Sequence, residues 1–161
     1  MATVHVVKAA RKDYPNEGIK KGESYFWWEF RYGGKYKSKT RPHASQLTQS
    51  EFLSQAYGIN EELGVLTSED FEGIEDRISE ITDRIRQLGE ECQEKFDNMP
   101  EGLQQGDTGQ TLENRVSSCE DWAGNLEGID LSLDEDLKGE DKESRIEEII
   151  SEVQGCQYEG E

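Results

Sequence analysis

The sequence predicts an α+β protein: a small, basic, antiparallel hairpin sheet with a covering helix, followed by an acidic antiparallel helical hairpin plus a third helix. Three observations support this prediction. A β-branched and aromatic run before Gly33-Gly34 has the composition of a hairpin strand. Apolar residues after position 67 recur at alternating three- and four-residue steps, as in packed helices. The net charge also changes sign between the two halves.

The formal charge of -18 over 161 residues is unevenly distributed. Residues 1–45 hold ten basic and four acidic side chains, which gives +6. The remaining 116 residues hold eight basic and 32 acidic side chains, which gives -24. An asymmetry of this size indicates two surfaces with different partners, or one surface that neutralises the other.

The basic half is predicted to form a first module over residues 1–60. Residues 3–7 and 24–32 have the composition of strands. A two-residue turn at Gly33-Gly34 would place Trp28 opposite Lys39, and would pair aromatic with lysine side chains along one face of the sheet.

A helix is predicted to follow and to cover one face of that sheet. Residues 48–51 have the spacing of a capping box, and the apolar side of the helix ends at Gly58. Residues 60–66 are then expected to be a linker.

The acidic half is predicted to form a coiled-coil-like helical domain over residues 67–156, with a frayed tail over 157–161. Residues 98–107 contain proline and glycine and form a connector between two helices. A third amphipathic helix ends at Gly155. The predicted helix seam consists of Phe71, Ile74, Ile78, Ile81, Ile85, Leu88, Cys92, Leu112, Val116, Cys119 and Leu126.

The sequence does not predict an enzyme. The only near-neutral bases are His5 and His43, and His43 lies two residues from Ser45 without an identifiable orienting acid. The acidic run over residues 130–141 lacks the glycine and the terminal glutamate of a calcium loop. We expect no catalytic residues, no metal, no cofactor and no membrane span, and we expect a cytoplasmic protein with reduced cysteines.

Two surfaces could bind a partner. On the hairpin, aromatic rings flanked by cations suit stacked bases and phosphates, but the same rings could equally form the core side of a thin sheet. The candidate nucleic-acid or partner contacts are Trp27, Trp28, Arg31, Lys35, Lys37, Lys39 and Arg41.

On the helices, rows of carboxylates could approximate the regularly spaced phosphates of nucleic acid and compete for a nucleic-acid-binding groove. An acidic spacer or oligomerising hairpin would have the same composition. The candidate mimic surface consists of Glu69, Asp70, Glu72, Glu75, Asp76, Glu80, Asp83, Glu90, Glu91 and Glu94.

The segment from Lys8 to Ser50, which includes Tyr25-Phe-Trp-Trp28 and Gly33-Gly34-Lys35, resembles the opening of small bacteriophage and prophage proteins. The resemblance covers about the first third of the chain. Its strand-Gly-Gly-Lys-strand part is also similar to the small sheet that phage integrases use on arm-type DNA sites. A short, very acidic phage protein resembles inhibitors of host defences, including anti-restriction and anti-CRISPR proteins, and this class implies no catalytic residues to carry over.

The expected function is therefore that of a non-enzymatic phage-type protein, which binds and inhibits a host nucleic-acid-handling protein in the host cytoplasm. One alternative is a nucleic-acid-binding module that uses the hairpin of residues 1–45. Another is a structural phage component that forms a homo-oligomer through the helix seam.

Overall fold

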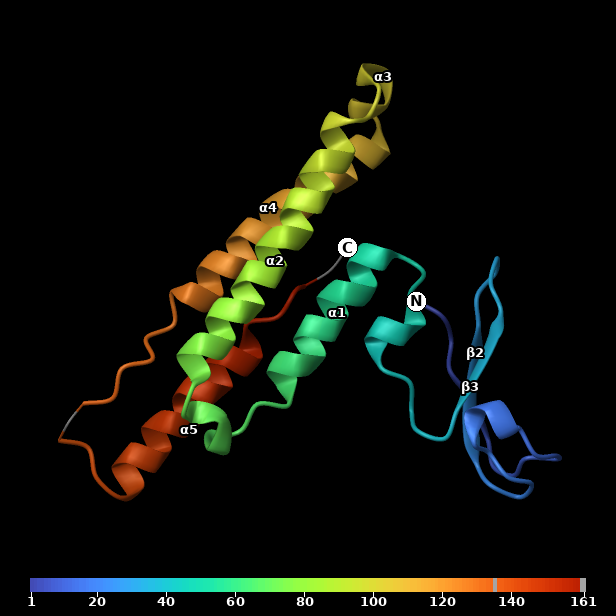
Figure 1. Cartoon of the computed structure of the whole chain (residues 1–161), viewed down its shortest axis with the longest axis horizontal. Helices are drawn as coiled ribbons and strands as arrows, with labels where there is room; N and C mark the ends of the chain where they lie inside the picture. Colours follow the sequence, from blue (N-terminus) through green and yellow to red (C-terminus); the bar gives the residue numbers. More distant parts are fainter. Residues whose placement is uncertain (135, 160–161) are drawn as a thin grey trace. The chain divides into compact units, whose positions relative to one another are not determined.

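The computed structural model describes residues 1–134 and 136–159. Three antiparallel strands precede five helices, which confirms the α+β class (Figure 1). The strands are β1 (His5–Val7), β2 (Tyr25–Glu29) and β3 (Lys35–Ser38). The helices are α1 (Glu51–Gly64), α2 (Ile74–Asp97), α3 (Glu101–Gln104), α4 (Asp107–Glu127) and α5 (Glu140–Gly155). Short 3-10 turns are η1 (Pro15–Glu17), η2 (Ala44–Leu47) and η3 (Ser68–Phe71).

The chain divides into two compact units, Met1–Gly58 and a second that begins at Ile59. The unit boundary falls within α1. We call the first the sheet unit and the second the helical unit, and each is described separately below.

The predicted register of the sheet is wrong by three residues. Trp28 lies opposite Tyr36, and Trp27 lies opposite Lys37. The chain turns over residues 30–34 and not over two glycines alone. Neither Gly33 nor Gly34 has the positive φ that the predicted turn requires. A Cβ atom at Gly33 would lie 2.8 Å from Gln49 Nε2, the end of a flexible side chain that can move aside, and 3.1 Å from Phe30 Cβ.

One face of the sheet is covered by the loop between β1 and β2. Ala10, Ile19 and Tyr25 form a buried cluster against which Val7 and Tyr14 pack. Backbone hydrogen bonds in both directions between Tyr14 and Ile19 close the loop. The cluster contains no residue from α1, so the predicted covering helix is not what fills this face.

Helix α1 begins later and ends later than the sequence predicts. The Ser50 Oγ atom accepts a hydrogen bond from the Leu53 amide at 3.3 Å, and therefore Ser50 caps the helix in place of Thr48. The helix continues through Gly58 because Ile59 and Leu63 are buried. Burial of two large side chains outweighs the roughly 1 kcal/mol that a glycine costs within a helix. The predicted stop at Gly58 is thus wrong, and of the linker predicted over residues 60–66 only residues 65 and 66 lie outside the helix.

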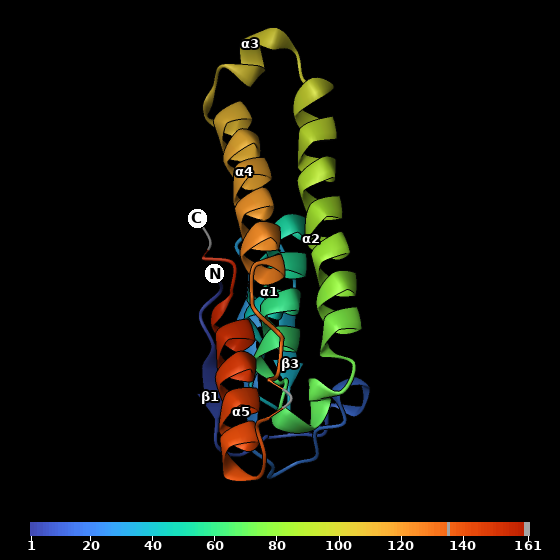
Figure 2. The ribbon, with the colours of Figure 1, turned by 90° about the vertical axis from the view of Figure 1, so that its left-hand side faces the viewer.

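Helices α2 and α4 lie side by side as an antiparallel hairpin, with α3 in the connection between them (Figure 2). Nine of the predicted seam residues are buried: Ile74, Ile78, Ile81, Ile85, Leu88, Cys92, Leu112, Cys119 and Leu126. Val116 is half-buried on α4, whereas Phe71 lies outside α2, in η3. Gly73 separates η3 from α2 with φ of 92°. A Cβ atom at Gly89 would lie 3.2 Å from Cys119 Cβ, which shows how closely α2 and α4 approach.

The third helix and the residues after it complete the core of the helical unit. Ile149, Ile150 and Val153 of α5 are buried. Asn60 donates to the Tyr158 carbonyl at 3.1 Å and accepts from the Tyr158 amide at 2.8 Å. The prediction of a frayed tail is therefore wrong for residues 157 and 158, while residues 160 and 161 lie outside the described part of the chain. Trp122 donates its indole N–H to the Cys156 carbonyl at 3.0 Å, and its ring centroid lies 5.7 Å from that of Tyr158.

The carboxylate of Asp70 closes a capping box around η3. It accepts hydrogen bonds from the Thr67 amide at 2.8 Å and the Thr67 hydroxyl at 3.0 Å, and it pairs with Arg77 Nη1 at 2.7 Å. These contacts, the Thr67 amide foremost, lower the pKa of Asp70. The ionised form is therefore the one that the fold stabilises.

The Asp70→Asn variant is expected to melt at a lower temperature than the wild type at pH 7. Because the folded pKa of Asp70 is lowered, its contribution is complete above the ordinary pKa of about 4 and is lost as the pH falls through the folded value. The difference in melting temperature should accordingly close in acid. Glu69→Gln, an exposed neighbour, is the control. A difference in melting temperature between Asp70→Asn and the wild type that stays constant from pH 7 to pH 2 would contradict this role.

Candidate functional site

The sheet unit places the two neighbouring tryptophans on opposite faces. The Trp27 ring stacks on His5 with centroids 4.2 Å apart, and Lys35 Nζ lies 3.3 Å from the same ring centroid. Trp28 stacks on Tyr36 at 5.7 Å and is only 5 % exposed. Its Nε1 atom is buried without a hydrogen-bond acceptor among the described residues. Neither ring offers an uncovered platform on which a base could stack.

The cations of the hairpin are partly neutralised within the sheet unit. Lys39 Nζ lies 2.9 Å from a carboxylate oxygen of Glu23, and Lys37 Nζ lies 3.7 Å from one of Glu17. Lys37 also lies 4.5 Å from the ring centroid of Tyr14. The remaining candidates Arg31, Lys35 and Arg41 are exposed. The structure therefore brings Trp27, Lys35 and Lys37 to one face, but it does not assemble the predicted ladder of aromatic and lysine pairs.

The helical unit presents an acidic face on α2, interrupted between Asp83 and Glu90 by the neutral Gln87. At about 100° of rotation per residue, six of its carboxylates fall within an arc of about 100° on the side opposite the buried seam. This acidic stripe consists of Asp76, Glu80, Asp83, Glu90, Glu91 and Glu94. All are exposed except Glu91, which is half-buried. The four basic residues of α2 lie outside that arc.

Three of those basic residues are paired with carboxylates elsewhere in the helical unit. Arg77 pairs with Asp70, Arg84 with Glu62 at 2.6 Å, and Arg86 with Glu127 at 2.7 Å. The pKa of Glu127 is lowered chiefly by its hydrogen bond from Arg86. The arginines thus connect α2 to neighbouring segments, and among the described ion pairs none joins a cation to the acidic stripe.

The spacing of the acidic stripe is comparable with that of nucleic-acid phosphates. From Asp76 to Glu94 the helix rises about 27 Å at 1.5 Å per residue, so the stripe carries roughly one carboxylate every 5 Å. One strand of duplex DNA carries a phosphate about every 3.4 Å. The linear density of negative charge on α2 is therefore about two thirds of that on one DNA strand.

Four of the ten predicted mimic residues lie outside the acidic stripe. Glu69, Asp70 and Glu72 precede Gly73, where the backbone breaks between η3 and α2. Asp70 is also held by Thr67 and Arg77. Glu75 is on α2 but lies about 60° beyond the arc, next to a cavity.

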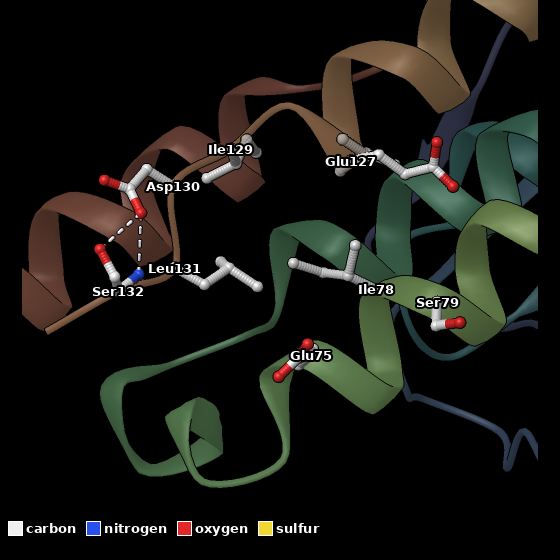
Figure 3. Close-up of a pocket in the computed structure, with 9 residues that line it drawn as sticks. Glu75, Ile78, Ser79, Glu127, Ile129, Asp130, Leu131 and Ser132 are labelled. Carbon is white, nitrogen blue, oxygen red and sulfur yellow. Dashed lines mark hydrogen bonds between the residues drawn. The ribbon is translucent and has the colours of Figure 1, made fainter.

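That cavity, of about 540 Å³, lies between the start of α2 and the segment that follows α4 (Figure 3). Its lining includes Glu127 and Asp130, neither of which the sequence analysis selected as a site residue. The antiparallel pairing of α2 with α4 brings them near Glu75, and no local pattern in the sequence indicates the path of the segment after α4. The acidic run that follows, over residues 130–141, includes Glu135, which lies outside the described residues.

In the described part of the chain, no group of three or more histidine, cysteine, aspartate or glutamate side chains is arranged to hold a metal ion. No helix among the same residues is long and apolar enough to span a membrane. Comparison of the chain with family models, curated proteins and solved structures gives no match.

Proposed function

We propose that this is a non-enzymatic binding protein whose acidic stripe occupies a basic, nucleic-acid-binding surface on another protein and inhibits it by competition. The observation that carries the proposal is the run of six carboxylates on α2 with no cation in the same arc. A surface that serves only solubility usually mixes both signs of charge. Here the arginines of α2 lie at its flanks, in ion pairs.

Two other features favour this function over its alternatives. Trp27 is stacked on His5 and covered by Lys35, and Trp28 is buried, which disfavours the binding of nucleic acid through bases stacked on the hairpin. The buried seam is used between α2 and α4 of one chain, so it leaves little apolar surface for a homo-oligomer. The resemblance of the first third of the chain to phage proteins suggests host defence proteins as the partner class.

The proposal is tested by capture from bacterial lysate on the immobilised full chain, followed by elution with duplex DNA. The test variant removes four charges from the stripe: Glu80→Gln, Asp83→Asn, Glu90→Gln and Glu94→Gln. The matched control removes the same charges from α5: Asp141→Asn, Glu143→Gln, Glu147→Gln and Glu152→Gln. All eight side chains are exposed.

The stripe variant should retain about tenfold less of the DNA-eluted proteins than the wild type does. The α5 control should retain as much of them as the wild type. Both variants carry the same net charge, so a difference in retention between them would depend on where the removed carboxylates lie. The proposal fails if DNA elutes no captured protein, or if both variants retain the eluted proteins equally.

A further inference from the structure

We infer that the cavity between α2 and the segment after α4 receives an arginine side chain from the basic partner. The inference rests on the proposed function and adds a specific contact to it. The cavity lies at the end of the hairpin that is remote from α3, so an arginine there would fix the position of the partner along α2.

The floor of the cavity is apolar. Ile78 and Leu126 are buried beneath it, and Ile129 and Leu131 are half-buried. In Figure 3 the side chains of Ile78 and Leu131 point toward each other from α2 and from the segment after α4. The volume of about 540 Å³ falls within the range of roughly 300–1,000 Å³ that ligand sites occupy. Such a floor suits the aliphatic stem of a long side chain.

The rim of the cavity is polar and negative. Glu75, Glu127 and Asp130 line it, together with the hydroxyls of Ser79 and Ser132. The carboxylate of Glu127 is engaged by Arg86 at 2.7 Å, whereas no ion pair is found for Glu75 within the described residues. Glu75 therefore supplies the uncompensated negative charge.

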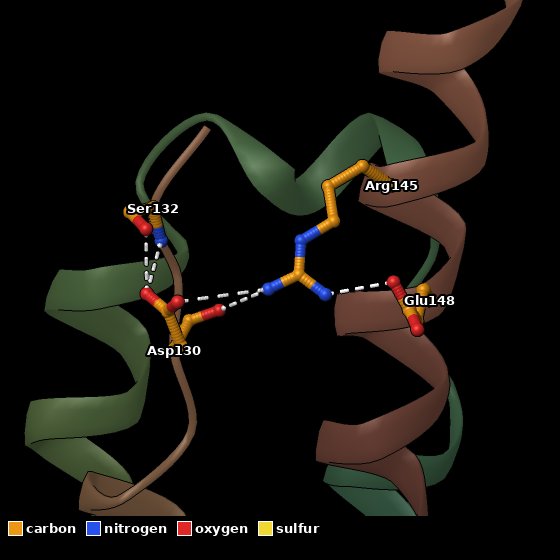
Figure 4. A network of polar contacts seen from close by, with 4 residues as sticks. All are labelled: Asp130, Ser132, Arg145 and Glu148. Carbon is orange, nitrogen blue, oxygen red and sulfur yellow. Dashed lines mark hydrogen bonds and ion pairs between the residues drawn. The ribbon is translucent and has the colours of Figure 1, made fainter. Parts of the chain in front are cut away.

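Asp130 is fixed in an ionised and oriented state (Figure 4). One of its oxygens accepts hydrogen bonds from the Ser132 hydroxyl at 2.6 Å and the Ser132 amide at 3.0 Å. These bonds are the main cause of the lowered pKa of Asp130. Its second oxygen lies 3.9 Å from Arg145, whose shorter contact, at 2.7 Å, is with Glu148. Arg145 also donates a hydrogen bond to the Asp130 carbonyl at 3.1 Å, so Arg145 compensates part of the charge of Asp130, and Glu75 is the rim carboxylate for which no ion pair is found among the described residues.

The helix ends do not cancel this charge. The first turn of α2 and the last turn of α4 meet at the cavity, and their dipoles have opposite signs there. Their effects offset one another, so the formal charges of Glu75 and Asp130 decide which ligand the cavity favours. A side chain with an apolar stem and a cationic end would contact the apolar floor with its stem and the carboxylates of the rim with its charge.

Arginine fits this combination better than lysine. Its planar guanidinium is weakly hydrated and presents several donors at once, which suits two carboxylates and two hydroxyls around one opening. Arginine is also enriched among the residues that dominate binding energy at protein interfaces.

The probe is a tetra-arginine peptide, titrated at low ionic strength into the full chain with labelled isoleucine and leucine methyl groups. The methyl signals of Ile78 and Leu131 should shift. A tetra-citrulline peptide, which has the same shape without the charge, should leave them in place. Glu75→Gln should weaken the titration about fivefold. Glu72→Gln, which removes the same charge from an exposed residue outside the cavity, should change it less than about twofold.

The inference is overturned if these methyl signals do not move, if citrulline moves them equally, or if Glu72→Gln weakens binding as much as Glu75→Gln. The unchanged methyl spectra of the free variants verify that both are folded. The two proposals can fail separately. If the stripe variant loses the DNA-eluted partners but the methyl signals do not shift, the proposed function stands and the arginine site is rejected. If the methyl signals shift but DNA elutes no partner, the arginine site stands and the proposed function is rejected.

Discussion

Replacement of Ile85 by alanine is expected to lower the free energy of unfolding of the helical unit by about 2–5 kcal/mol. Ile85 lies in the middle of α2 and is 0 % exposed. Its removal would therefore lose the transfer free energy of the buried methyl groups and leave a cavity that the packed helices can fill only in part. Urea titration followed by circular dichroism at 222 nm measures the change.

Gln87→Ala is the control for this substitution, since Gln87 is exposed on the same helix. It should alter the free energy of unfolding by less than about 0.5 kcal/mol. A milder change at the buried position, Ile85→Val, should cost about 0.5–1.5 kcal/mol. Equal effects of Ile85→Ala and Gln87→Ala would show that α2 does not bury this face.

Two glycine-to-alanine substitutions in α4 are expected to change stability in opposite directions. A Cβ atom at Gly109 would lie 2.0 Å from the backbone oxygen of Gln104. Backbone cannot move aside as a flexible side chain can, and Gln104 also donates to the Phe96 carbonyl at 3.0 Å and the Met99 carbonyl at 3.1 Å. Gly109→Ala should therefore displace the connection between α3 and α4, and we expect it to cost about 1–3 kcal/mol.

Gly124→Ala is the matched substitution, because nothing lies within 4 Å of a Cβ atom at that position. Alanine is favoured over glycine within a helix by about 1 kcal/mol, so this variant should be more stable than the wild type. Urea titrations of the two variants are compared with that of the wild type. A stabilising effect of Gly109→Ala would disprove the close contact with Gln104.

The elements that the sequence predicted correctly are those that local patterns specify. The alternating steps from Ile74 to Cys92 depend on helical geometry alone, and so the helical hairpin follows from the sequence. The hairpin register did not, because the turn spans residues 30–34 and neither Gly33 nor Gly34 has a positive φ. Composition shows that two glycines are present, but it does not show which backbone conformation they adopt.

Contacts between distant residues account for the other errors. The sequence predicts a linker at Asn60 and a frayed tail at Tyr158. In the structure the side chain of Asn60 forms two hydrogen bonds with the backbone of Tyr158, although the two residues are 98 positions apart in the sequence. The two candidate sites also differ in how far the sequence predicts them. The acidic stripe follows from the helical period of α2, whereas the cavity requires Glu75 and Asp130 to meet through the pairing of α2 with α4. The helical period predicts that pairing, but it does not predict that the irregular segment after α4 lies beside the start of α2.

The position of Trp122 gives the helical unit an optical reporter. Of the three tryptophans, Trp27 and Trp28 belong to the sheet unit, and Trp122 alone belongs to the helical unit. In a chain with Trp27 and Trp28 replaced by phenylalanine, tryptophan emission would come from one indole that lies against Tyr158 and donates to the Cys156 carbonyl. The emission maximum would move to longer wavelength when release of the C-terminal segment exposes Trp122 to water. Emission followed over time during refolding would give the rate at which that segment docks.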